Sequence, residues 1–83
     1  MLKFTYQYHG NSFSSSAILF EDGGALIYHV TFEGAELDIT PSGIKDSNGR
    51  IIWVQTHNPG EIVQPHELVQ AMGEGIEKIG NLR

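Results

Sequence analysis

Hydrophobic and polar residues alternate along the first two-thirds of the chain, a period of two that is typical of strands with one buried face. In residues 2–9 the apolar side is formed by Leu2, Phe4, Tyr6 and Tyr8, and aromatic residues favour strands. Four further segments are rich in β-branched, aromatic or alternating apolar residues. The pattern therefore predicts five strands, at residues 2–9, 12–21, 25–33, 35–40 and 50–57.

The period changes near the end of the chain. Apolar residues at Val69, Met72, Ile76 and Ile79 recur at steps of three and four, which predicts an amphipathic helix over residues 65–79. Leu68 and Leu82 flank this apolar stripe, and Pro65 suits the first helical position because no N–H is needed there.

Gly73 and Gly75 interrupt the helical pattern, and each costs about 1 kcal/mol relative to alanine in a helix interior. Two glycines within one turn indicate a kink or a close approach of another backbone. A helix that is shorter than the pattern suggests is the alternative.

Short turns separate the predicted strands. Gly10-Asn11 and Glu33-Gly34 suit tight turns, and Asn48-Gly49 favours a type I′ hairpin inside a connector at residues 41–50. The run Ser14–Ser16 indicates a bulge or an exposed edge, because hydroxyl groups can satisfy nearby backbone groups. Neighbouring strands joined by short turns form an antiparallel meander.

The predicted fold class is α+β: a five-stranded, mainly antiparallel meander sheet with one C-terminal helix packed on one face. The 83 residues form a single small domain, 1–83, whose apolar fraction of 40% is sufficient for a globular core. A chain of this size buries only about 60–65% of the surface of its unfolded form, so we expect a thin core.

Charge and composition exclude several classes of function. The net charge is −5 and the five basic residues are spread singly, whereas nucleic-acid binding depends on clustered lysine and arginine. The chain has no cysteine, which fits a reducing cytoplasm. It also has no signal-peptide pattern and no apolar run near the ~18 residues of a membrane span, so we expect no membrane partner.

A loop between the last strand and the helix holds His57, Glu61 and His66, which offer an alternative function as a metal-dependent or small-ligand enzyme. Zinc sites on helices use His-x-x-x-His spacing, which is absent. The sequence NPGE is typical of a turn and QPHE of a helix start. We therefore interpret the segment as a strand–helix joint and expect neither metal nor cofactor.

Other catalytic signals are weak. The serines at 14–16 lack a G-x-S-x-G elbow, and no glycine-rich phosphate loop is present. Glu36 and Asp38 share a wet strand face, while His9 and His29 lie on separate strands and are expected to be exposed or half-buried. The sequence therefore does not favour an enzyme.

The leading hypothesis is a non-enzymatic protein-interaction or regulatory module, self-associating through a sheet face or edge. The apolar run 17–20 predicts burial on both faces or a bend, and residues 51–54 are apolar throughout. The residues expected to line the second sheet face are Ile18, Phe20, Ile27, Ile51 and Trp53. A third hypothesis is an acidic inhibitor that mimics nucleic acid, which requires Glu33, Glu36 and Asp38 to be grouped on one surface.

Overall fold

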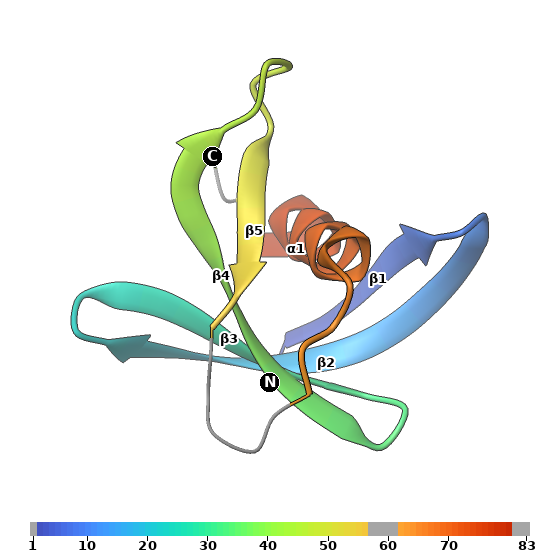
Figure 1. Ribbon diagram of the computed structural model, residues 1–83. Helices are drawn as coiled ribbons and strands as arrows, with labels where there is room; N and C mark the ends of the chain where they lie inside the picture. Colours follow the sequence, from blue (N-terminus) through green and yellow to red (C-terminus); the bar gives the residue numbers. More distant parts are fainter. Residues whose placement is uncertain (1, 57–61, 81–83) are drawn as a thin grey trace.

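The computed structural model describes residues 2–56 and 62–80 and confirms the α+β class (Figure 1). All strand pairs are antiparallel, and the sheet order β1-β2-β3-β4-β5 is that of the predicted meander. The elements are β1 Leu2–Tyr8, β2 Asn11–Asp22, β3 Ala25–Phe32, β4 Ala35–Lys45, β5 Ile51–Gln55 and α1 His66–Gly80.

Two-residue turns join the first four strands. Glu33-Gly34 forms a turn as predicted, with φ values of 47° and 76°. The first turn, predicted at Gly10-Asn11, lies one residue earlier, at His9-Gly10, with φ values of 50° and 78°. A hairpin turn of this kind needs positive φ at both positions, and Asn11 is paired with Tyr8 in the ladder instead.

The predicted connector at residues 41–50 is wrong in its first half, because β4 continues to Lys45 across a register shift between Pro41 and Lys45. Asn48-Gly49 does not form the predicted type I′ turn, since only Gly49 of the pair has positive φ. The Asp46 carboxylate organises the loop instead: its Oδ1 accepts hydrogen bonds from the N–H groups of Asn48 and Arg50 at 2.8 and 3.0 Å.

The serine run is not a bulge. Ser14, Ser15 and Ser16 pair in regular register with Thr5, Phe4 and Lys3 of β1. On the other side, pairing with β3 includes Ser16 but not Ser14 or Ser15, so the predicted edge is found at those two residues.

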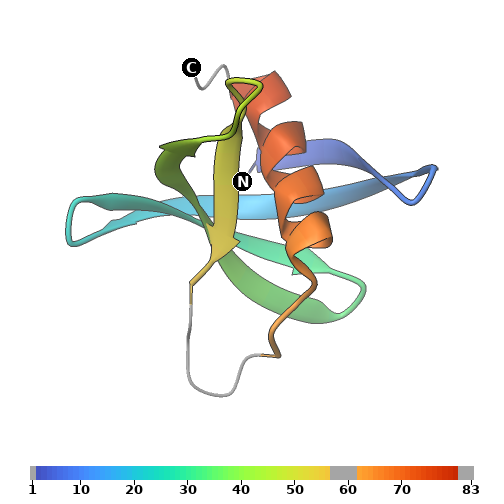
Figure 2. The ribbon, with the colours of Figure 1, turned by 45° about the horizontal axis from the view of Figure 1, so that its top comes forward.

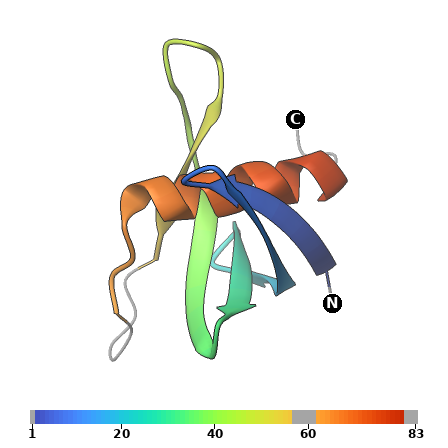
Figure 3. The ribbon, with the colours of Figure 1, turned by 90° about the vertical axis from the view of Figure 1, so that its right-hand side faces the viewer.

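The sheet curls around α1, which lies between β5 and β1 (Figure 2). The β4–β5 and β3–β4 hairpins extend to opposite sides of the helix (Figure 3). Val69, Met72 and Ile76 are buried as predicted, whereas Ile79 remains 47% exposed. Full burial of a side chain such as Met72 or Ile76 stabilises the fold by about 1.5–3 kcal/mol.

Gly73 and Gly75 mark a close approach, as one of the sequence interpretations predicts. A Cβ atom on Gly73 would lie 2.0 Å from Cγ of Trp53, and one on Gly75 would lie 2.3 Å from the carbonyl oxygen of Thr5. The helix runs through both positions to Gly80, so the interpretation of a shorter helix is wrong.

The helix also covers both outer strands of the sheet. The Gln70 side chain behaves like a neighbouring strand: its Oε1 accepts from Trp53 N at 2.9 Å, and its Nε2 donates to Ile51 O at 2.8 Å. Backbone groups of the β5 edge are thereby satisfied, while Gly75 brings the helix against β1. Within the described residues, no helix is long and apolar enough to cross a membrane.

We predict that Gly73→Ala lowers the free energy of unfolding by at least ~1 kcal/mol. The added methyl group would lie 2.0 Å from Cγ of Trp53, so we expect a cost at or above the upper end of the usual range of about 1–3 kcal/mol for overpacking, which exceeds the gain of about 1 kcal/mol in helix propensity. Urea denaturation of the full chain measures the change.

Two variants make this prediction specific. Lys78→Ala, on the exposed part of the same helix, should change stability by less than ~0.5 kcal/mol. In a Trp53→Leu background Gly73→Ala should cost less, because the smaller side chain vacates the overlap. An equal cost in both backgrounds would show that the Gly73–Trp53 contact is not the cause.

Candidate functional site

The face of the sheet opposite the helix, which we call the outer face, has no helix packed on it, although Ile27 on this face is buried, at 9% exposure. Residues paired across strands share a face, which places Phe20 beside Ile27, and Thr40 beside Val54. The Thr40 hydroxyl donates to the carbonyl oxygen of Leu26 at 2.6 Å and so ties β4 to β3 at this level. An apolar band therefore crosses the outer face.

This band continues into residues 18–27, which we call the β2–β3 arm. The arm projects from the body of the sheet, away from α1 (Figure 1). Ile18 and Phe20, on the outer face, are 53% and 40% exposed, and Leu19 and Leu26, on the other face, are 50% and 40% exposed. The expected burial of residues 17–20 is therefore correct for Ala17 alone, because the helix does not extend over the arm.

Three of the five residues predicted for the second sheet face lie on the outer face: Ile18, Phe20 and Ile27. The placement of Ile51 and Trp53 there is wrong. Trp53 is fully buried beneath the helix, with its ring 5.5 Å from that of Tyr28, and Ile51 packs against the same core. Val54, paired with Thr40, lies on the outer face.

A charged cluster borders the apolar band. His29, opposite Ile18 in the ladder, lies between two carboxylates of β4. Its Nδ1 is 2.5 Å from Asp38 Oδ1, and its Nε2 is 2.8 Å from Glu36 Oε1. Because a neutral imidazole carries only one N–H, both contacts are hydrogen bonds only when the ring is protonated.

These carboxylates raise the pKa of His29 above its ordinary value of 6.5, with the hydrogen bond to Glu36 as the largest cause and that to Asp38 next. Burial opposes the shift, but more weakly. The side chain of Glu36 is 63% exposed and that of Asp38 is 13% exposed. When His29 is protonated, the cluster presents one cation between two anions beside the apolar band.

The hypothesis of a nucleic-acid mimic requires grouped, unneutralised carboxylates. Glu36 and Asp38 do share the outer face, but His29 bridges them, and Glu33 belongs to the preceding turn. The bridge formed by His29 therefore interrupts the row of negative charges that a nucleic-acid mimic requires.

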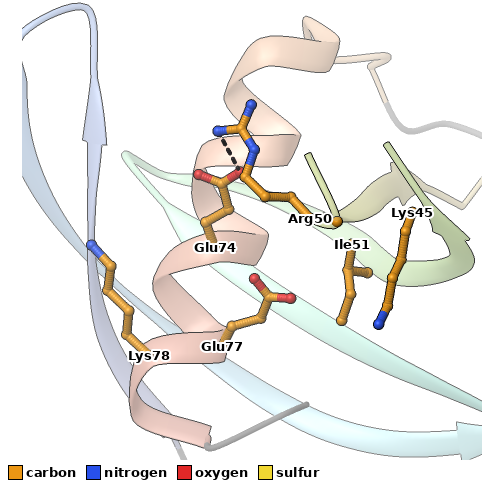
Figure 4. Close-up of a pocket in the computed structure, with 7 residues that line it drawn as sticks. Lys45, Arg50, Ile51, Glu74, Glu77 and Lys78 are labelled. Atoms are coloured by element: carbon orange, nitrogen blue, oxygen red, sulfur yellow. Dashed lines mark ion pairs between the residues drawn. The ribbon is translucent and has the colours of Figure 1, made fainter. Parts of the chain in front are cut away.

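Several open cavities lie beside the helix. One, of about 420 Å³, lies between the β4–β5 hairpin and the C-terminal half of α1 (Figure 4). Arg50 reaches across it toward Glu74, with Nη1 3.8 Å from Oε2, while Lys78 points away from the other labelled side chains. This ion pair links the β4–β5 hairpin to the helix. It does not place a nucleophile beside a general base.

The second cavity, of about 510 Å³, is lined by Phe4, Ser15, Phe32 and Ile79 among others. The Oγ atom of Ser15 is buried without a hydrogen-bond partner. No histidine lines this cavity, and neither the Glu33 carboxylate nor the Lys3 amine in its lining forms a hydrogen bond with the Ser15 hydroxyl.

The alternative metal site cannot be assembled from the described part of the chain. His57 and Glu61 lie outside the described residues, and Nε2 of His66 is 3.2 Å from the carbonyl oxygen of Trp53, to which it donates when protonated there. Among the described residues, no group of three histidine or acidic side chains could hold a metal ion.

Comparison with protein-family models, with curated proteins and with solved structures finds no match to this chain. The fold and the outer face are therefore the basis for assigning a function.

We predict that Glu36→Gln lowers the pKa of His29, because a neutral amide replaces the charged acceptor that contributes most to the shift. Titration of the imidazole signals by NMR measures the change. Glu33→Gln, in the adjacent turn, removes a carboxylate that does not contribute to this shift and should leave the His29 pKa unchanged.

The raised pKa also makes stability depend on pH. The contribution of His29 is fully present below about pH 6.5, the pKa in the unfolded chain, and is lost as the pH rises through the folded pKa. The stability advantage of the wild type over His29→Gln should therefore shrink across this window. An advantage that grows with pH would refute the protonated bridge.

Proposed function

We propose that this chain is a non-enzymatic protein-interaction module whose contact surface is the outer face together with the β2–β3 arm. The supporting observation is the exposure of Ile18 and Phe20 beside Leu19 and Leu26, so that both faces of a projecting hairpin are apolar. Contiguous exposed apolar surface on a small domain is typical of interaction sites.

The surroundings of the apolar band suit a protein partner. A protein interface combines an apolar centre with a polar, solvated rim. Here the exposed Ile18 and Phe20 would form the centre, beside the buried Ile27, and the neighbouring His29–Glu36 pair would form part of the rim. The net charge of −5 favours a protein over a nucleic acid as the partner. The absence of cysteine supports a cytoplasmic location.

The core and the contact surface are separate in this proposal. Removing an apolar group from the outer face should cost little stability, because the side chains of Ile18 and Phe20 are about half exposed. Binding and folding can therefore be tested independently.

We predict that Phe20→Ser and Ile18→Ser keep the fold but weaken binding to the natural protein partner at least ~tenfold, the equivalent of one buried apolar anchor. The wild-type chain is immobilised, bound proteins are identified, and each is then purified and titrated against wild type and variants. A second copy of this chain counts as a partner.

Ile44→Ser is the matched control, because Ile44 is more exposed than Phe20 but lies on the β4–β5 hairpin. It should bind as the wild type does. Partners that respond equally to all three changes, or only to Ile44→Ser, would contradict the proposed surface.

A further inference from the structure

We infer that the outer-face partner is a second copy of this chain, joined through antiparallel pairing of the β2 edge at residues 18–22 about a two-fold axis at Phe20. This inference rests on the proposed function and specifies its partner.

The first step is the edge itself. Pairing between β1 and β2 begins at Leu2↔Ala17, whereas pairing between β2 and β3 runs to Asp22↔Ala25. Residues 18–22 therefore have a neighbouring strand on the β3 side only, within the described chain. Alternate backbone N–H and C=O groups on the other side are available to a further strand.

Two further stretches also have a paired strand on one side only: residues 11–15 of β2, which are mostly polar, and residues 25–27 of β3, where Leu26 O already accepts from Thr40. The remaining edges are protected. The helix packs against β1, and Gln70 satisfies backbone groups of β5. The extension of β4 beyond β3 contains Pro41 and a register shift, and both features discourage strand addition. Residues 18–22 contain neither feature, and no described element packs over them.

The second step is the complementarity of the segment with itself. With the two-fold axis at Phe20, Phe20 faces Phe20 of the second copy, Leu19 faces Glu21, and Ile18 faces Asp22. No carboxylate lies directly opposite another carboxylate, an arrangement that would destabilise the pair. Residues directly opposite share a face, so the apolar band of Ile27 and Phe20 continues into the second copy.

The pairing is isologous and closes as a dimer, because each copy uses the same segment. The contact is confined to one strand and its flanking side chains, and it falls short of the ~800 Å² per partner of a standard interface. Association should therefore depend on concentration rather than be permanent.

Single-cysteine variants test the register, since the natural chain contains no cysteine. Directly opposite residues in an antiparallel pair have Cα atoms about 4.5–5.5 Å apart, within disulfide range. Phe20→Cys should therefore form a covalent dimer under mild oxidation. Ile18→Cys is the control, because residue 18 lies on the same face as residue 20 and is more exposed. In the inferred register, residue 18 of one copy is four strand positions, or ~13 Å, from residue 18 of the other copy.

The expected result is cross-linking of Phe20→Cys at least ~tenfold faster than of Ile18→Cys in dilute solution. Random collision would instead favour the more exposed position 18. Equal rates, or faster cross-linking at position 18, would overturn the inferred register.

Sedimentation of variants with equal charge provides a second measurement. Phe20→Lys sets two lysines opposite each other and should abolish dimerisation, whereas Ile18→Lys sets lysine opposite Asp22 and should preserve it. A wild-type chain that remains monomeric at millimolar concentration overturns self-association. If another protein then still requires Phe20 for binding, the proposed function stands; if none does, both fail.

Discussion

The close contact between the helix and the curled sheet is the constraint on which the rest of the structure depends. Glycine at 73 leaves room for the Trp53 ring, and glycine at 75 lets the helix backbone approach β1 at Thr5. Only at this separation can Gln70 pair with the backbone of β5. The two glycines weaken the helix as an isolated element, and tertiary packing offsets that loss.

The change from a two-residue to a helical period is sufficient to predict the strand meander, the helix and the burial of Val69, Met72 and Ile76. This change of period cannot show which face of a strand is buried when apolar and polar residues do not alternate along that strand. In residues 51–54 every side chain is apolar, so the pattern gives no choice between faces, and the predicted face of Trp53 is the wrong one. Its actual side follows from the space at Gly73, a long-range contact that no local pattern contains.

The hydrophobic pattern also fails to predict the contact of His29 with Glu36 and Asp38, for a different reason. The alternation shows that Glu36 and Asp38 share a face but does not relate them to His29. The signal lies in the turn: with Glu33-Gly34 as a two-residue turn, counting outward pairs Phe32 with Ala35 and hence His29 with Asp38. Register derived from turn length thus brings these side chains together from the amino-acid sequence alone.

The position of the helix also explains why the apolar arm is exposed. One helix of 15 residues suffices to cover β1 and β5, the two outer strands of the sheet. A helix that covers these two strands is too short to extend over the far end of β2 and β3 as well. There the β2–β3 hairpin extends beyond its pairing with β1 and β4. Exposed apolar residues there contribute little to the thin core. Their arrangement on both faces of a hairpin whose β2 edge is unpaired is therefore the basis for the proposed contact with another protein chain.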